Sequence, residues 1–139
     1  MPGNGYSNIN IVGLDGFQGT SPVNPFPTAT AAATVQRINA LATTNLTSAA
    51  VGARTVTGFV LVNTTAAFKF VKLYDKASAP VLATDVPLVT LAVPPNGTLV
   101  SDASFAIALG LAYAITNLVA DTDATAVTAD AVHGFIAHR

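Results

Sequence analysis

Two histidines flank the last apolar stretch of the chain, and histidine is the side chain most often recruited for acid–base chemistry and metal binding near neutral pH. The stretch reads HGFIAHR, with His133 at its start and His138 near its end. In a strand, a five-residue step places two side chains on opposite faces, so these imidazoles are not expected to share a metal ion. We therefore predict two surface histidines without a catalytic role.

Aspartates cluster just before this stretch, in the segment ADTDATAVTADA. Asp121, Asp123 and Asp130 could together attract a calcium ion, because hard cations prefer clustered carboxylates. The segment does not follow the spacing of an EF-hand loop, and aspartates are also common in the turns of β-proteins. The two interpretations, a calcium site and a set of turn residues, both remain open, and turns are favoured.

No other motif points to catalysis. The sequence has no cysteine and no Gly-x-Ser-x-Gly elbow, which excludes a cysteine nucleophile and argues against a serine-hydrolase elbow. The segment GLDGFQG, residues 13–19, resembles a glycine-rich phosphate loop but lacks the Lys-Ser/Thr ending. We predict a protein that is not an enzyme and that binds neither a cofactor nor a metal ion.

Three lysines and an aspartate stand close together in AFKFVKLYDKA. Lys69, Lys72 and Lys76, together with Asp75, account for a large share of the charges of the chain. One interpretation is a solvated strand face, where lysine discourages edge-to-edge aggregation. The other is a rim of charges that orients a partner protein. Both interpretations place these lysines in contact with solvent or with a neighbour.

The composition is unusually poor in charge. Of the 139 residues, 51% are hydrophobic and only 9% are charged, whereas about a quarter of the residues of a typical soluble domain are charged. We infer that partners or further copies of the chain cover much of its surface. The net charge of −1 provides no basic field for nucleic acid or for an anionic membrane. Residues 105–120 form the one membrane-like run, which we interpret as two buried strands.

The elements that must carry these residues are predicted to be strands. Short alternating apolar segments are separated by turn signals roughly every ten residues, a pattern typical of an antiparallel sandwich or barrel. The expected strands cover residues 35–41, part of 43–53, 56–63, 68–74, 88–93, 99–100, 105–109, 111–117 and 132–137. A helix over residues 103–119 is the competing interpretation. We predict an all-β, antiparallel β-sandwich of about eight strands, which is the strand count of a jelly roll.

The first 28 residues differ from the remainder. They are rich in Gly, Pro, Asn and Ser, yet apolar side chains recur along them: Tyr6, Ile9, Ile11, Leu14, Phe17, Val23 and Phe26. Disordered linkers usually lack such aromatics. We predict an extended N-terminal arm over residues 1–28 that binds a partner through these side chains, or that lies on its own domain, residues 29–139.

Several phrases of the sandwich region resemble a known family. The residues VNTTAAFKFVKLYDKASAPVLATDVPLVTLAVPP, FAIALGLAYAITN and ADTDATAV, followed by GFIAH, are similar to the jelly-roll decoration (cement) proteins of tailed-bacteriophage capsids. The similar region spans roughly residues 56–138 and rests on scaffold features. The arm lies outside it.

The resemblance implies a structural protein of the virion. Such a protein binds the outer surface of the capsid lattice and stabilises it by bridging neighbouring major capsid protein subunits. It is a homo-oligomer, for which we favour a dimer over a trimer. The alternative is a β-sandwich module of the tail or adsorption apparatus that binds a host glycan or another tail protein. A small β-barrel enzyme is the least favoured possibility.

Overall fold

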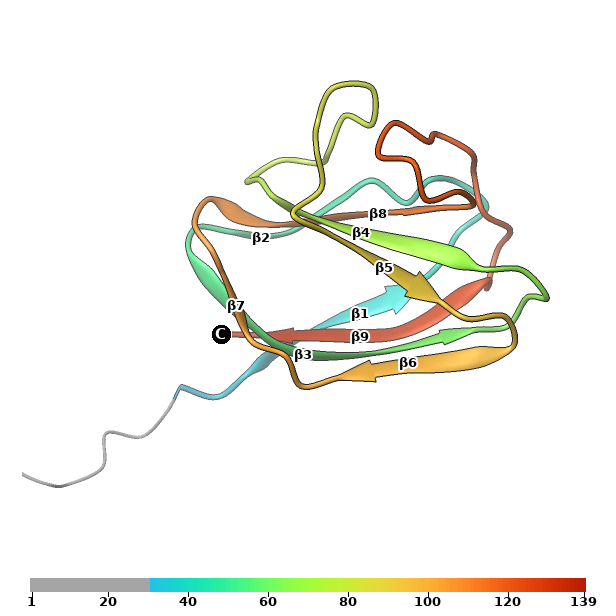
Figure 1. Cartoon of the computed structure of the whole chain (residues 1–139). Coiled ribbons are helices and arrows are strands. Elements are labelled where there is room, and N and C mark those ends of the chain that lie inside the picture. Colours follow the sequence, from blue (N-terminus) through green and yellow to red (C-terminus); the bar gives the residue numbers. More distant parts are fainter. Residues whose placement is uncertain (1–30) are drawn as a thin grey trace, which may run out of the picture. The chain divides into compact units, whose positions relative to one another are not determined.

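A computed structural model describes residues 31–139, which form nine strands and no helix (Figure 1). The strands are β1 (Thr34–Asn39), β2 (Thr47–Val51), β3 (Arg54–Asn63), β4 (Lys69–Asp75), β5 (Val89–Val93), β6 (Gly97–Ser101), β7 (Phe105–Ile107), β8 (Gly110–Thr116) and β9 (Val132–His138). Each strand predicted from sequence is present, with boundaries shifted by a few residues. The prediction of an all-β fold is confirmed.

The strands form two sheets that pack face to face. One sheet, called here the five-stranded sheet, has the order β1-β9-β3-β6, with β7 also paired to β3. The other, the four-stranded sheet, has the order β2-β8-β4-β5. All pairs are antiparallel. Figure 1 shows the five-stranded sheet below and the four-stranded sheet above. The antiparallel sandwich predicted from sequence is therefore confirmed.

The pairing pattern is that of a jelly roll. Strands β6 and β7 lie end to end along one edge of β3, opposite Phe59–Asn63 and Arg54–Val56 respectively, so they occupy one strand position. The chain then pairs from its ends inward: β1 with β9, β2 with β8, β3 with β7 and β6, and β4 with β5. Such a long folded-back ribbon, rolled into two sheets, makes eight strand positions.

The helix considered for residues 103–119 is wrong. That segment forms β7 and β8, joined by a tight turn at residues 108–109. In β8, Leu111, Tyr113 and Ile115 point into the core, whereas Ala112 and Ala114 are buried on the opposite face. Burial on both faces explains why the segment is apolar throughout and mimics a helix or a membrane span. Among residues 31–139, no helix is long and apolar enough to cross a membrane.

The core lies between the two sheets and is built from alternate residues of the strands. On β1, Ile38 is buried while Val35 is 59% exposed, as the predicted alternation requires. The largest fully buried apolar side chains of this core are Ile38, Leu61, Leu73, Ile107, Leu111, Ile115 and Ile136. Branched aliphatic side chains of this kind pack densely with few alternative arrangements, so the core provides a rigid scaffold.

One corner of the sandwich is held by a buried amide. Asn63, at the end of β3, donates two hydrogen bonds, to the carbonyl oxygens of Ala67 (2.8 Å) and Val93 (3.1 Å). Its own side-chain oxygen accepts from the backbone N–H (2.9 Å) and the hydroxyl (2.8 Å) of Thr65. The Pro-Pro-Asn-Gly turn crosses here from the four-stranded to the five-stranded sheet, with Asn96 in the left-handed conformation (φ 46°).

Candidate functional site

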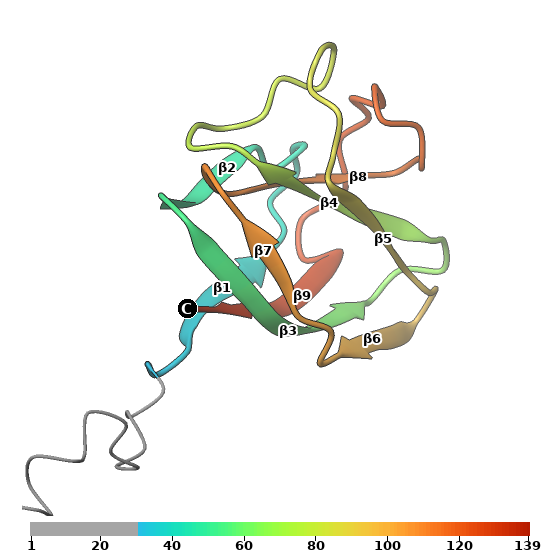
Figure 2. The same cartoon turned by 60° about the vertical axis from the view of Figure 1, so that its left-hand side comes forward.

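Two long loops cover the outer face of the four-stranded sheet (Figure 2). These are the connections β4–β5, residues 76–88, and β8–β9, residues 117–131. Beneath them a second apolar cluster forms from Tyr74, Leu82, Ala112 and Ala114, which are all at most 6% exposed. The hydroxyl of Tyr74 is buried there without a hydrogen-bond partner, and burial raises its pKa. Loops of the same chain therefore cover this face of the four-stranded sheet.

Lys72 lies under these loops. Its side chain is fully buried opposite the small residue Ala114, and its ammonium group donates to the carbonyl oxygens of Ala120 (2.5 Å) and, more weakly, Asp121 (3.4 Å). Burial lowers the pKa of Lys72, and the nearby charges of Asp123 and Asp121 oppose part of this shift. Lys72 thus fastens the β8–β9 loop to the sheet.

The prediction that the lysines face solvent or a partner is wrong for two of the three. Lys69, like Lys72, is buried, at 8% exposure. Lys76 is partly exposed and forms an ion pair with Asp85, which also accepts a hydrogen bond from the Val81 N–H (2.7 Å). These two contacts hold the pKa of Asp85 below its usual value, led by the Lys76 bond. Lys72 and Lys76 serve the fold by holding loops of their own chain, and Lys69 is on the same side of β4 as the core residues Val71 and Leu73.

Asp75 is the last residue of β4, and its side chain binds the turn between β7 and β8. Its carboxylate accepts hydrogen bonds from the backbone N–H groups of Leu109 (2.6 Å), Ala108 (3.1 Å) and Gly110 (3.4 Å). These bonds, led by the one from Leu109, lower the pKa of Asp75. The aspartate thereby fixes the turn between β7 and β8.

We expect the contribution of Asp75 to depend on pH. Because its pKa is lower in the folded chain than the unfolded value of 3.8, its stabilisation is present above that pH and is lost as the pH falls through the folded value. Asp75→Asn should therefore reduce stability at pH 7 and flatten the loss of stability between pH 5 and acid, the pH range that follows from this linkage. Urea midpoints of both proteins across that range measure this. Parallel pH profiles for the two proteins would contradict the assignment.

The aspartates considered for calcium are used within a turn. Asp123 accepts hydrogen bonds from the N–H of Leu118 (2.8 Å) and from the N–H (3.2 Å) and hydroxyl of Thr125. Asp130 adopts a left-handed turn conformation (φ 59°). Within residues 31–139, no three His, Cys, Asp or Glu side chains gather as metal ligands would. The geometry therefore favours turn residues over a calcium site.

The two histidines lie on opposite faces of β9, as the spacing predicts. His133 faces outward between Asn39 and Val62. His138, however, is only 5% exposed, so the prediction of two surface histidines is wrong for it. Burial, with the positive charge of Arg54 as a smaller cause, lowers the pKa of His138 and favours the neutral imidazole. The two imidazoles cannot act together.

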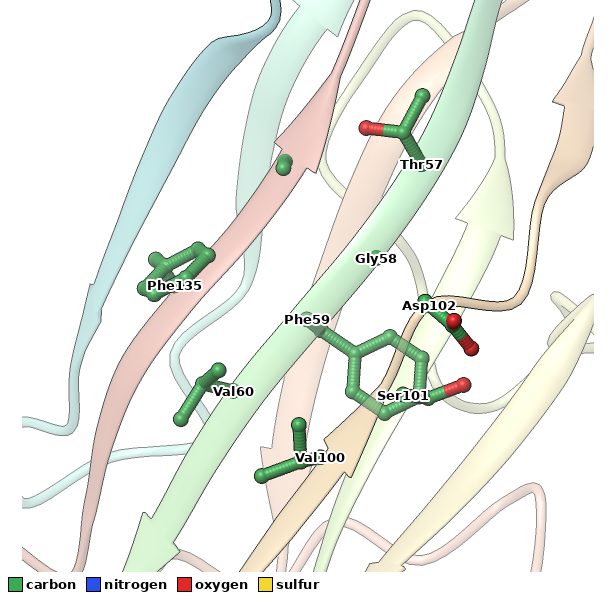
Figure 3. Close-up of a pocket in the computed structure, with 9 residues that line it drawn as sticks. Thr57, Gly58, Phe59, Val60, Val100, Ser101, Asp102 and Phe135 are labelled. Atoms are coloured by element: carbon green, nitrogen blue, oxygen red, sulfur yellow. The ribbon is translucent and has the colours of Figure 1, made fainter.

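The outer face of the five-stranded sheet is open. Arg37, Phe135, Val60 and Val100 form a row across β1, β9, β3 and β6, since each is the register partner of the next. Val100 is 66% exposed and Phe135 is 36% exposed. Figure 3 shows Phe135, Val60 and Val100 on neighbouring strands, and Asp102 just past the end of the strand that carries Val100. They line a shallow depression of about 510 Å³. This surface, which we call the open face, is the best candidate site.

Sequence reasoning did not find the open face. Residues 56–63 are apolar on both faces, which indicates burial on both sides. Val60 and Val62 are instead only half-buried, facing outward on the open face. Loop length alone would not have found it, because the long β8–β9 connection joins the two sheets and only its fold places it over the four-stranded one.

The predicted partner-binding residues of the arm fall outside the described part of the chain. These are Tyr6, Ile9, Ile11, Leu14, Phe17 and Phe26, and the GLDGFQG segment lies there too. The described structure begins at Ala31, and its first strand, β1, is an edge strand of the sheet that carries the open face.

Comparisons with known proteins add no assignment. No protein-family model, curated protein or solved structure matches the chain.

Proposed function

We propose that the chain is a non-enzymatic structural protein of a bacteriophage virion: a decoration protein that binds the outer surface of the capsid and bridges neighbouring major capsid protein subunits. The observation that carries this proposal is the asymmetry of the jelly roll. Its own loops close one sheet face, whereas the other presents the apolar row of Phe135, Val60 and Val100 to solvent. An exposed apolar face of this kind is typical of a protein-binding surface.

The charges of the sandwich support a structural role. Lys72, Asp75, Asp123 and the Lys76–Asp85 pair are all engaged in fastening loops and turns. Catalytic groups instead converge on a cleft with unsatisfied hydrogen-bonding capacity toward a substrate. These five charged side chains thus stiffen the loops and turns of the sandwich, which suits a protein that must hold its shape while attached to a lattice.

The arm predicted for residues 1–28 is long enough to attach to a neighbouring subunit. A chain of twenty-eight residues, when fully extended, spans up to about 90 Å. Two weak contacts on one molecule, one by the arm and one by the sandwich, multiply into strong retention on a repeating surface. The apolar residues predicted to bind through the arm are those from Tyr6 to Phe26.

The alternative is a module of the tail apparatus that binds another tail protein. The same open face suits such a partner. A glycan ligand fits less well, because sugar sites usually place an exposed aromatic ring with a polar handle beside polar side chains, whereas the sequence has no Trp and Tyr74 and Tyr113 are both buried.

Binding to capsids tests the proposal. Purified full-length protein is mixed with mature, undecorated capsids of the phage that encodes it, and the pelleted protein is quantified. We expect saturable binding at a fixed ratio to the major capsid protein, and none to capsids that are already fully decorated. Failure to pellet with undecorated capsids would overturn the decoration role and favour the tail alternative.

A further inference from the structure

We propose that the open face binds a second copy of this chain, face to face, in a two-fold dimer in which Arg37 of each copy pairs with Asp102 of the other. Strand pairing fixes the layout of the face. Arg37 on β1 stands at one end of the apolar row, and Val100 on β6 stands at the other. Asp102 follows Val100 by two residues and lines the same depression. The face therefore carries a positive group along one edge and a negative group along the other.

Two copies can stack open face to open face with the two-fold axis either along the strands or across them. Only the first arrangement brings opposite charges together. With the two-fold axis along the strands, β1 of one copy lies over β6 of the other. Phe135 then meets Val60 of the second copy, and Arg37 lies over its Val100. Asp102 is about 7 Å further along the chain, a distance that an arginine side chain spans. Both edges form the same pair, because the axis relates them.

The second way to stack the face is disfavoured by the same charges. With the axis across the strands and through the apolar row, each strand lies over its own copy, so Arg37 approaches Arg37 and Asp102 has no arginine opposite it. Like charges in close contact oppose association. Arg37 and Asp102 are exposed, and within residues 31–139 neither takes part in an ion pair. Each is therefore available to the second copy.

The size of the face sets the strength of the dimer. Four strands about 4.8 Å apart, with about six residues each, make a face of about 20 by 20 Å. Such an interface buries about 800 Å² in total, which is below the range of stable complexes, so we expect a weak dimer with a dissociation constant of about 100 μM. Sandwich sheets that pack in this way lie about 10 Å apart, which leaves room for Phe135 and the valines to interdigitate.

The dimer would also pair the arms. Strand β1 lies at an edge of the face and begins at Thr34, so two copies related by this axis start their β1 strands at the same end, on opposite sides. The dimer would then carry two attachment segments, which raises avidity for a repeating surface. Dimerisation itself does not require that the surface be a capsid.

Charge exchange tests the geometry in the full-length chain. Sedimentation velocity over about 5 to 500 μM should show a concentration-dependent dimer. Arg37→Asp alone and Asp102→Arg alone each replace two attractive pairs with repulsive ones, so each should weaken dimerisation about 10-fold or more. The double variant R37D/D102R restores opposite charges and should recover most of the affinity. Failure of the double variant to recover would overturn the proposed pairing.

A matched pair of valines tests the face itself. Val100→Asp places a charge on the open face, and Val86→Asp places one on the β4–β5 loop, where Val86 is 76% exposed. We expect V100D to be monomeric and V86D to dimerise normally. A wild type that stays monomeric over the whole concentration range would overturn the proposal. A wild type that dimerises only after residues 1–28 are removed would also overturn it, because the arm of the same chain would then cover the face. Sedimentation velocity is run without capsids, so its outcome is independent of the capsid pelleting that tests the decoration role.

Discussion

Alanine at position 134 should prevent the chain from folding into its sandwich. A Cβ atom on Gly134 would lie 1.9 Å from the carbonyl oxygen of Val60 and 2.9 Å from its carbonyl carbon. The neighbouring atoms belong to the backbone of β3, which is hydrogen-bonded to β9 on one side and to β6 on the other, so they cannot move aside. The glycine also has φ +137°, a conformation that side chains rarely adopt.

The expected cost of Gly134→Ala is above about 4 kcal/mol, which is close to the entire stability of many domains. Far-UV circular dichroism and urea unfolding measure it. Gly52→Ala is the matched control, because Gly52 also has a positive φ (+84°) but its added Cβ would meet nothing closer than Arg54 Nη1 at 4.0 Å. It should cost about 1–2 kcal/mol. A Gly134→Ala protein as stable as Gly52→Ala would show that the two central strands pair differently.

The strands of the jelly roll could be predicted because their signals are local. Alternation along residues 34–39 separates buried Ile38 from exposed Val35, and the turn residues at Pro94–Gly97 end β5. The burial of β8 on both of its faces could also be predicted, because its continuous apolar run is bounded by Gly110 and Asn117. These features depend on neighbours in sequence, and therefore appear in the sequence itself.

The burial of Lys72 could not be predicted in the same way. The burial of Lys72 depends on a loop nearly fifty residues later in the chain, where the Ala120 carbonyl oxygen accepts a hydrogen bond from the lysine ammonium group. The same holds for His138, which is buried where β9 ends beside β3. A lysine or histidine in a strand is usually a surface residue, and only the tertiary placement of long loops reverses that expectation.

The open face escaped prediction for the opposite reason. The outward residues Val60 and Val100 are as apolar as core residues. The sequence of β3 therefore predicts burial on both faces, whereas the strand is buried on one face only. Apolar residues that face outward and apolar residues in the core give the same sequence pattern. The scarcity of charge in the whole chain led us to expect a covered surface, and that expectation stays a prediction.

Serine substitutions in the arm should have the second-largest effect. We expect the full-length variant I9S/I11S/L14S/F17S to bind undecorated capsids about 100-fold more weakly, because it loses one of two linked contacts. Its urea midpoint should equal that of the wild type if the arm serves attachment alone. Pelleting isotherms measure the binding. The control is V81S/V86S, with two exposed loop valines replaced, which should bind normally.

An arm variant that binds capsids as tightly as the wild type would move the attachment to the sandwich and remove the role proposed for Ile9, Ile11, Leu14 and Phe17. An arm variant with a lowered urea midpoint would instead support the interpretation in which the arm packs on its own domain.

We propose that the protein strengthens a capsid. The most direct test is the temperature at which undecorated capsids release their DNA to a fluorescent dye, measured with and without saturating full-length protein. We expect a release temperature that rises with occupancy and stops rising at saturation. An unchanged release temperature on fully occupied capsids would contradict it.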